Sequence, residues 1–347
     1  MRLRVLTSIL ALAFFSSGVV FGKPLVIAHR GASGYLPEHT LEAYARAITM
    51  GSDFIEPDVV STKDGVLIAR HENELSDTTN VATVFPEAKT KKTIDGRMVE
   101  GWFSEDFTLN EIKTLRAKER LVFRDQTNNG KFLIPTLAEV LALAESEGQK
   151  RGRAVGVYIE TKHPTYFSGL GLDLEVPLLK NLKAAKLDQA LQRVFIQSFE
   201  ISNLKRLKTL TAAPLVQLLG EADERPYDQE TASNPLTYGD MASDQGLAGI
   251  ATYAAGVGPY KAYLVPVDRE GVSGLPTDFV QRAHKAGLKV HPYTFRNESR
   301  YLAKSYNGDP VAEYCAFFAL GIDGLFSDFA DTALKARDTS CPIPPVK

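Results

Sequence analysis

The sequence has 347 residues, of which 44% are hydrophobic and 24% are charged. These proportions exclude a largely disordered chain and indicate a globular protein with one large core or two smaller ones. A net charge of -2, without any block of Lys and Arg residues, argues against a protein that binds nucleic acid.

The N-terminus has the features of a secretory signal peptide. Arg2 and Arg4 precede a stretch from Val5 to Gly22 that contains no charged residue. The apolar part is shorter than the roughly 20 residues that a membrane helix needs. We therefore expect residues 1–22 to be a signal peptide that is cleaved before Lys23, and we expect no stable membrane insertion.

Short apolar segments alternate with helical patterns along the rest of the chain. Most are continuous apolar runs, which is typical of parallel strands buried on both faces. Between the first two, Leu41, Tyr44, Ala45 and Ile48 repeat at helical spacing. This alternation favours an α/β fold, and a (β/α)8 barrel over an open doubly wound sheet. The expected strands are 25–29, 54–60, 66–71, 155–162, 194–199, 214–219, 289–295 and 324–328.

Residues 72–131 do not fit a minimal barrel, because they form a long polar connection between two expected strands. Within it, Thr108 and Glu111 have the spacing of a capping box and predict a helix over 109–120. Thr136 and Glu139 repeat the pattern after the connection. A connection of this length is usually an inserted lobe, and in a barrel it would overhang the face where active sites lie.

Three carboxylates follow or end apolar runs. Glu56 and Asp58 point to the same face because side chains alternate along a strand. Pro57 lacks the donor that a central strand needs, so the pair is expected at the strand's end. With Glu160 they would form an all-oxygen site for a divalent cation, calcium or magnesium. The alternative is a set of rim carboxylates neutralised by Lys or Arg.

Two histidines each end an apolar run, which places them at the catalytic rim of a barrel. A single His there is more often structural, whereas His29 and His71 beside metal-binding carboxylates suit general acid and base catalysis. Arg30 and Lys162 would suit an anionic substrate, or could simply balance neighbouring carboxylates. We expect His39 to pack or cap at the start of a helix. The other histidines, expected to be structural, are His163, His284 and His291.

The sequence has two cysteines, Cys315 and Cys341. In an oxidising compartment they could form a disulfide that ties the C-terminal tail, 341–347, to the last helix. Two distant cysteines are also common without any bond between them, and both possibilities remain open. The chain lacks a Gly-x-Ser-x-Gly elbow, which argues against a serine hydrolase.

Several motifs together resemble the glycerophosphodiester phosphodiesterase family, and most closely its periplasmic bacterial branch. The resemblance covers residues 25–329 and depends on AHRGASGYLPEHTLEAYARAI, FIEPDVVSTKDGVLIARHENELSDTTNV, YIETKHP, QSF and HPYTFR. It implies a single TIM-barrel domain over 23–340, with 72–131 as the family's inserted lobe after the third strand. The implied activity is metal-dependent hydrolysis of deacylated phospholipids, such as glycerophosphocholine and glycerophosphoethanolamine, to glycerol 3-phosphate and an alcohol.

The resemblance also implies roles for the residues above. Carried over by position, the acid and base would be His29 and His71, and the phosphate would be held by Arg30 and Lys162. The divalent ion, calcium in this branch with magnesium possible, would be bound by Glu56, Asp58 and Glu160. Many members carry Trp-Thr-x-Asn on the late strand. Here the corresponding residues are Tyr293, Thr294, Phe295 and Arg296, which leaves the role of Arg296 open.

Two other functions compete with this one. A phospholipase D-like enzyme acting on intact lipids would need an exposed apolar rim, whereas the insertion is rich in charged residues. A secreted surface binding protein could retain the barrel without catalysis, but the complete acid, base and metal set argues against that loss. We therefore expect a periplasmic enzyme with small-molecule substrates, and the sequence leaves its oligomeric state open.

Overall fold

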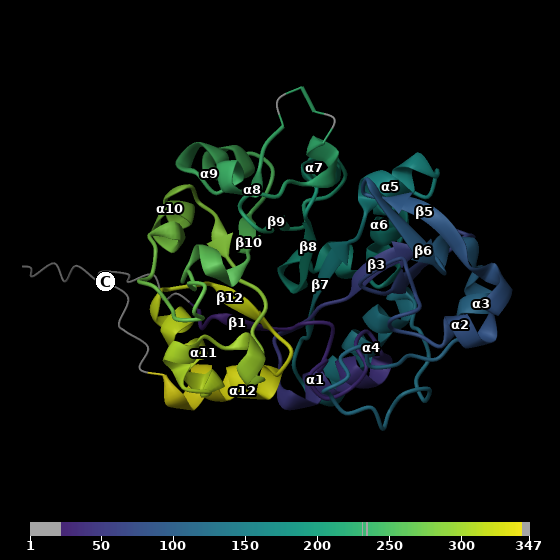
Figure 1. The fold of residues 1–347 in the computed structure, drawn as a ribbon, viewed down its shortest axis with the longest axis horizontal. Coiled ribbons are helices and arrows are strands. Elements are labelled where there is room, and N and C mark those ends of the chain that lie inside the picture. Colours follow the sequence, from purple (N-terminus) through teal and green to yellow (C-terminus); the bar gives the residue numbers. More distant parts are fainter. Residues whose placement is uncertain (1–21, 231, 234, 342–347) are drawn as a thin grey trace, which may run out of the picture.

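The computed structural model describes residues 22–230, 232–233 and 235–341. The expected signal peptide, except Gly22, and residues 342–347 of the expected tail lie outside the described residues. Eight parallel strands form a nearly closed barrel with helices around it, in the order β11-β10-β9-β8-β7-β2-β1-β12 (Figure 1). A parallel bridge between Phe295 and Ser327 brings the two ends of this order together. The predicted barrel is confirmed. Its strands are β1 (Leu25–Ala28), β2 (Phe54–Ile55), β7 (Gly156–Thr161), β8 (Val194–Ser198), β9 (Leu215–Leu219), β10 (Gly256–Pro259), β11 (Lys289–Val290) and β12 (Gly324–Ser327).

Two further strands extend the sheet beside β7. Pro57 divides the predicted strand 54–60 into β2 and β3 (Asp58–Ser61), and β4 (Leu67–Ala69) returns antiparallel along β3. The prediction that 66–71 is a barrel strand is therefore wrong. The turn at 62–66 is too short for a parallel crossover, which needs about a dozen residues. The eighth place in the barrel belongs to β10, which the sequence did not mark clearly.

The helices pack their apolar faces onto the outside of the barrel. In α1, Ala43, Tyr44, Ala47 and Ile48 are buried, and the Thr40 side chain caps the first turn. The helices of six or more residues are α1 (Leu41–Met50), α4 (Leu137–Lys150), α5 (Pro164–Gly169), α6 (Glu175–Ala184), α7 (Ile201–Leu210), α9 (Asp244–Ile250), α10 (Phe279–Lys285), α11 (Pro310–Ala319) and α12 (Ala330–Lys335). No described helix combines the length and apolar character needed to cross a bilayer.

A second, smaller core fills the inside of the barrel. The rings of Tyr158 and Phe195 stack with centroids 4.7 Å apart, and Phe326 meets Tyr158 edge to face. The fully buried His291 lies 2.8 Å from the Tyr158 hydroxyl through Nδ1. His291 is therefore structural, as expected, and these rings close the barrel beneath the polar groups described below.

The inserted lobe lies between β4 and β7. It contains α2 (Val81–Val84), α3 (Leu109–Ile112) and an antiparallel hairpin of β5 (Thr90–Ile94) and β6 (Arg97–Gly101), which Figure 1 shows beside α5. Both predicted capping boxes are present. The helix predicted over 109–120 ends at Ile112, however. Beyond it the backbone bonds to other segments: Arg116 donates to the Asn80 side chain and Ala117 to the Phe132 carbonyl.

His163 joins the lobe to the barrel. Its Nδ1 lies 2.6 Å from Oδ2 of Asp95, in the β5–β6 turn, and its Nε2 lies 2.9 Å from Oε2 of Glu72. Burial opposes the charged imidazolium, but the hydrogen bonds to the two carboxylates outweigh it and raise the pKa of His163 to about 9. At neutral pH this half-buried histidine is a cation between two carboxyl groups.

We expect the His163→Gln variant to lose stability in a pH-dependent way. The folded-state pKa lies above the 6.5 of an ordinary histidine, so the stabilisation is complete below about pH 6.5 and is lost as the pH rises through about 9. The free energy of unfolding should fall by about 2 to 3 kcal/mol at pH 6 and much less at pH 10. Urea denaturation at both pH values measures this. His284→Gln, which breaks a more exposed pair with Asp323, is the control, and an equal loss at both pH values for His163→Gln would contradict the prediction.

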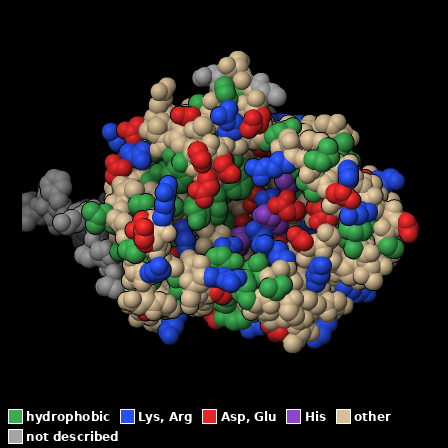
Figure 2. All heavy atoms as spheres, in the orientation of Figure 1, with side chains coloured by type: hydrophobic (Ala, Val, Ile, Leu, Met, Phe, Trp, Pro, Cys, Tyr) green, Lys and Arg blue, Asp and Glu red, His purple; other side chains and the backbone are tan. Residues whose placement is uncertain are grey.

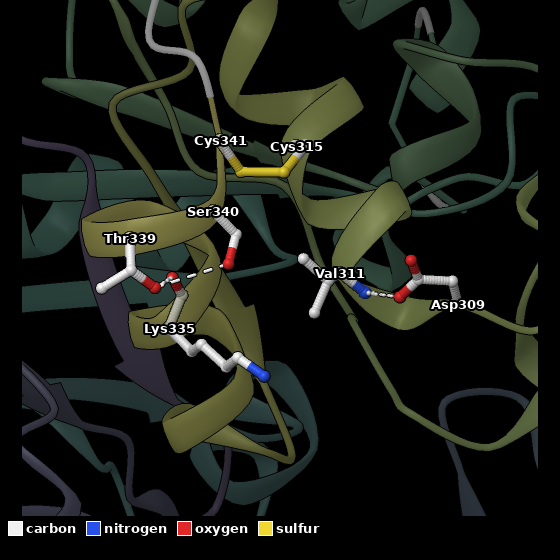
Figure 3. Close-up of a disulfide and its surroundings, with 7 residues drawn as sticks. All are labelled: Asp309, Val311, Cys315, Lys335, Thr339, Ser340 and Cys341. Atoms are coloured by element: carbon white, nitrogen blue, oxygen red, sulfur yellow. Dashed lines mark hydrogen bonds between the residues drawn. A yellow bond between two sulfur atoms is a disulfide. The ribbon is translucent and has the colours of Figure 1, made fainter.

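The two cysteines form a disulfide. Cys315 lies in α11 and Cys341 follows α12, and the bond closes a loop with a sequence separation of 26 residues (Figure 3). A loop of that length reduces the entropy of the unfolded chain by an amount worth about 3 kcal/mol.

We expect Cys341→Ser to lower the free energy of unfolding by about this amount in urea denaturation. A reductant should destabilise the wild type similarly and leave the variant unchanged; a variant as stable as the oxidised wild type would contradict the prediction.

Candidate active site

The polar groups predicted from the sequence meet at the carboxyl ends of the barrel strands. A cavity of about 210 Å³ opens there, and His29, Arg30, Glu56, His71 and Glu160 line it. The remaining two predicted residues touch this group, because Asp58 lies 3.7 Å from Arg30 and Lys162 lies 2.9 Å from Glu160. The structure thus brings all seven candidate residues together.

Three buried carboxylates form the centre of the site. Glu56 follows β2, Asp58 begins β3, and Glu160 lies opposite Asp58 in the register of β3 with β7. One oxygen from each lies within 4.8 Å of the others. The break at Pro57 places Glu56 and Asp58 at a strand end, as the sequence predicted. There they lie against Glu160 from the neighbouring strand.

The electrostatics of this cluster favour a bound cation. Burial and repulsion from Asp58 and Glu160 raise the pKa of Glu56 well above its usual range. Burial also raises the pKa of Glu160, to about 7, although Lys162 pulls the other way. For Asp58 burial acts in the same direction, but His39 and Arg30 outweigh it and lower the pKa. Three carboxylates in one buried place therefore repel one another unless a positive ion lies among them.

Two oxygen atoms also lack partners. Oδ1 of Asp58 and Oε1 of Gln197 are buried and accept no hydrogen bond from any described residue. Gln197 lines the same cavity and donates its amide to Glu56, at 2.7 Å. Unpartnered buried oxygens beside a carboxylate cluster are the donors that a hard divalent cation uses, so these residues fit such an ion.

Arg30 and Lys162 supply the fixed positive charges of the site. The Arg30 guanidinium lies 3.2 Å from Glu38, while its buried Nε has no hydrogen-bond partner among the described residues. The Lys162 ammonium lies 2.9 Å from Glu160 and 3.3 Å from Nε2 of His71. Each cation thus balances a carboxylate, while Arg30 also lines the cavity and Lys162 contacts two residues that line it, so the two interpretations made from the sequence are compatible.

Each histidine is held by a carboxylate through its Nδ1 atom. His29 Nδ1 lies 2.6 Å from Oδ1 of Asp328, which follows β12, and His71 Nδ1 lies 2.7 Å from Oε1 of Glu72. This arrangement fixes both rings and leaves Nε2 of His29 for proton exchange, while Nε2 of His71 lies 3.3 Å from the Lys162 ammonium. Burial and then Arg30 lower the pKa of His29 to about 4. They also lower the pKa of His71, whose side chain is 29% exposed.

Several residues of the site were not predicted as functional. Asp328 contacts His29 and two arginines, Arg124 from the lobe at 2.6 Å and Arg296 at 2.9 Å. The contact with Asp328 gives Arg296 a structural partner at the cavity. The one available signal was the position of Asp328 at the end of the predicted strand 324–328. Glu72 could have been found as the immediate neighbour of His71.

His39 does more than pack at a helix start. It is fully buried, its Nε2 lies 3.1 Å from Oδ2 of Asp58, and its Nδ1 lies 2.7 Å from the Tyr44 hydroxyl. The helix cap is the neighbouring Thr40. His39 therefore orients a carboxylate of the cluster, and no sequence pattern indicated this long-range contact.

Another part of the cavity wall is apolar. Phe199, Leu218, Tyr260, Tyr293 and Phe326 line it. Figure 2 shows this division: hydrophobic side chains line the left of the central hollow, and histidines with charged side chains gather on its right.

The chain resembles known proteins along most of its length. The model of the glycerophosphoryl diester phosphodiesterase family matches residues 29–332. The chain is 39% identical to glycerophosphodiester phosphodiesterase GDPD6 of Arabidopsis thaliana, over 93% of this chain and 88% of that protein. It is 32% identical to a glycerophosphodiester phosphodiesterase of Haemophilus influenzae, over 90% and 89%. Among solved structures, it resembles an Oleispira antarctica phosphodiesterase in complex with the product sn-glycerol-3-phosphate, with a TM-score of 0.59, 21% identity and coverage of 91% and 98%.

Proposed function

Since this chain belongs to the glycerophosphoryl diester phosphodiesterase family and hydrolyses glycerophosphodiesters to glycerol 3-phosphate and an alcohol, we propose that the reaction takes place in the cavity above. The observation that carries the proposal is the meeting of two carboxylate-held histidines with three buried carboxylates at one cavity. Residues 23–340 act as one catalytic domain, with 72–131 as its insertion.

Glu56, Asp58 and Glu160 would hold a divalent cation, and we propose calcium, with magnesium as the alternative. When bound, the ion supplies positive charge to oxygens of the substrate. The chain contributes the oxygen donors, and His39 fixes Asp58 in the orientation that it needs. Gln197 holds Glu56 in the same way.

Arg30 and Lys162 would bind the phosphate of the substrate. Both are buried cations whose charge is favoured by neighbouring carboxylates, and Arg30 has an unused Nε–H donor. Two fixed cations offset the negative charge that grows on phosphoryl oxygens during the reaction. Because they are held before substrate arrives, little reorganisation is needed.

The two histidines would move the protons. The glycerol 2-hydroxyl attacks phosphorus, Nε2 of one histidine takes the hydroxyl proton, and the other histidine donates a proton to the departing alcohol. Water then opens the resulting cyclic phosphate with the two roles reversed. Holding the hydroxyl next to phosphorus contributes on the order of 7 kcal/mol, which removes the need for a protein nucleophile. Asp328 and Glu72 keep each ring in place through both steps.

We also propose that the protein is secreted to the periplasm after loss of residues 1–22, as in the periplasmic bacterial branch. The signal-like N-terminus supports this. The disulfide between Cys315 and Cys341 supports it too, because such bonds persist in oxidising compartments. Mass spectrometry of the exported protein should find Lys23 as its first residue; an intact Met1 would exclude cleavage at this position.

The reaction is tested by measuring glycerol 3-phosphate released from glycerophosphocholine. The protein from Lys23 onward is assayed with calcium, with magnesium and with EDTA. Turnover should vanish in EDTA and return with calcium more than with magnesium. Turnover that persists in EDTA would contradict the metal requirement, and absence of release from folded protein under all conditions would contradict the proposed function.

A further inference from the structure

Two side chains of the inserted lobe, Arg124 and Asp95, connect the lobe to the proposed acid and base. Asp95 lies in the two-residue turn between β5 and β6, and Arg124 lies in the connection that follows α3. Neither has a part in the proposed chemistry. Their contacts nevertheless lead to the two histidines, one to each.

Arg124 fixes the carboxylate that holds His29. Its side chain is only 6% exposed, although both neighbouring residues are exposed. The guanidinium donates to Oδ2 of Asp328 at 2.6 Å, to Glu298 at 2.7 Å and to the Ser33 carbonyl at 3.0 Å. The Ser33 hydroxyl in turn donates to the backbone carbonyl of His29. A planar guanidinium held in three directions leaves the carboxylate little freedom to turn, so the ring on its other oxygen is fixed as well.

Arg296 contacts the same carboxylate from another side. Its Nε lies 2.9 Å from Oδ2 of Asp328, and Arg296 itself lines the cavity. Asp328 would therefore keep one cationic partner in the absence of Arg124. The loss of Arg124 should loosen the carboxylate without leaving it unpaired, and this limits the expected effect.

Asp95 acts through His163 on the carboxylate that holds His71. Oδ2 of Asp95 lies 2.6 Å from Nδ1 of His163, and Nε2 of His163 lies 2.9 Å from Oε2 of Glu72. The other oxygen of Glu72 lies 2.7 Å from Nδ1 of His71. Because the Lys162 ammonium can only donate, Nε2 of His71 accepts from it and Nδ1 carries the proton. The Glu72 side chain is 49% exposed, so the contact with His163 restrains an otherwise mobile group.

The two connections have the same construction. In each, one carboxylate oxygen holds Nδ1 of a catalytic histidine, and the other oxygen is bonded to a cation. Arg124 belongs to the lobe, and His163 is held by Asp95 of the lobe. A carboxylate fixed at both oxygens keeps the ring proton on Nδ1 and leaves Nε2 for the substrate.

We propose that Arg124 and Asp95 are positioning residues, through which the inserted lobe orients both catalytic histidines. This inference rests on the proposed function, which makes His29 and His71 the acid and base. Neither Arg124 nor Asp95 lines the active-site cavity. Their loss should therefore lower kcat and leave KM almost unchanged.

The first test compares Asp95→Gly with Asp95→Asn. Asp95 and Gly96 have φ values of 45° and 76°, and both glycine and asparagine fit the first position of such a turn. Asparagine keeps an acceptor oxygen for His163, whereas glycine does not. With glycerophosphocholine and saturating calcium, kcat should fall about tenfold in Asp95→Gly and stay within about twofold of the wild type in Asp95→Asn.

Arg124→Ala tests the other connection. We expect kcat to fall about tenfold, and no further because Arg296 still contacts Asp328. Arg124→Lys keeps the charge but loses the planar fork, so its kcat should lie between those of the wild type and Arg124→Ala. The lysine variant also tests this connection if the alanine variant does not fold.

Nitrogen NMR of the histidine rings separates positioning from general damage, because it shows which ring nitrogen carries the proton. At a fixed pH the wild type should have the proton on Nδ1 in both His29 and His71. Asp95→Gly should change the signals of His71 alone, and Arg124→Ala those of His29 alone. Spectra of His29→Ala and His71→Ala assign the signals.

Tyr166→Phe is the matched control. The Tyr166 hydroxyl, in α5, donates to Glu105 of the lobe at 2.6 Å, so the variant removes a contact between lobe and barrel that does not lead to either histidine. Both kcat and the ring spectra should be unchanged in Tyr166→Phe.

The possible outcomes are distinct. Unchanged kcat in Asp95→Gly or Arg124→Ala would overturn the role of that residue. An equal fall of kcat in Tyr166→Phe, or a fall without any change in the ring spectra, would overturn the inference, because the lobe would then act only through its attachment. Failure of the wild type to hydrolyse glycerophosphocholine would instead contradict the proposed function, and the spectra would still decide whether the lobe orients the rings.

Discussion

Replacement of His71 by alanine is expected to lower kcat for glycerophosphocholine at least about a hundredfold. His71 lines the cavity with its Nδ1 held by Glu72, and its Nε2 lies beside the Lys162 ammonium of the proposed phosphate site, where it would exchange a proton with substrate. His29, held by Asp328, has the matching position. His29→Ala should therefore cause a loss of the same order. Steady-state kinetics with saturating metal measures both effects, and circular dichroism checks that the fold is retained.

A substrate with a better leaving group separates the two roles. Glycerophospho-p-nitrophenol needs little protonation of its departing oxygen. In a single turnover that follows release of the alcohol, the variant that lacks the first-step acid should therefore lose much less activity on it than on glycerophosphocholine. The variant that lacks the base should lose activity on both. His284→Ala, at an exposed position outside the site, is the control. Unchanged turnover in His71→Ala would refute its assignment as acid or base.

Replacement of Glu56 by glutamine is expected to have opposite effects on the metal-free and metal-bound protein. Burial and repulsion raise the pKa of Glu56, so the ionised carboxylate destabilises the metal-free fold above its normal titration range. The neutral amide removes that cost, and the metal-free variant should melt a few degrees higher than the wild type at pH 7.5.

In the wild type, a divalent cation at one hundred times its Kd should add about 2.7 kcal/mol to the free energy of unfolding. Most of this gain should be absent from Glu56→Gln, and kcat/KM at low calcium should fall at least about tenfold. Thermal unfolding in EDTA measures the expected rise in the melting temperature of the metal-free variant. A calcium titration in the same assay measures its expected loss of stabilisation by calcium. Glu313→Gln removes another buried carboxylate, paired with Lys261 away from the site, and should not alter the calcium response. A full calcium response in Glu56→Gln would exclude this carboxylate as a ligand.

Local sequence patterns predicted most of the barrel strands correctly. They missed the strand at 256–259 and wrongly assigned 66–71 to the barrel. The strand at 256–259 consists of Gly, Val, Gly and Pro, so it lacks the β-branched run that marks its neighbours. Its glycines fit close packing, since a Cβ on Gly256 would lie 3.0 Å from the Lys289 carbonyl oxygen and one on Gly258 would lie 2.6 Å from the Leu218 side chain. Segment 66–71 has the expected apolar run, but its short turn joins it to β3 as a hairpin.

Local sequence patterns also predicted only part of the active site. Residues that carry charge at strand ends were found from the sequence, because the ends of parallel strands meet at one face of a barrel. Their partners were not, because those contacts are made only when distant segments fold together. Asp328 is 299 residues from His29, and Gln197 is 141 residues from Glu56. Within the inserted lobe, contacts of Arg116 and Ala117 with other segments likewise override the local preference for a longer helix.

If the chain is secreted as proposed, the bond between Cys315 and Cys341 determines when it becomes fully stable. In a reducing cytoplasm the two cysteines remain as free thiols. A newly made chain therefore lacks the disulfide's contribution of about 3 kcal/mol to the free energy of unfolding. A weaker fold is easier to keep open for passage through a translocation channel. After export, oxidation would link Cys341 to α11 covalently. The chain would then unfold more slowly and less often.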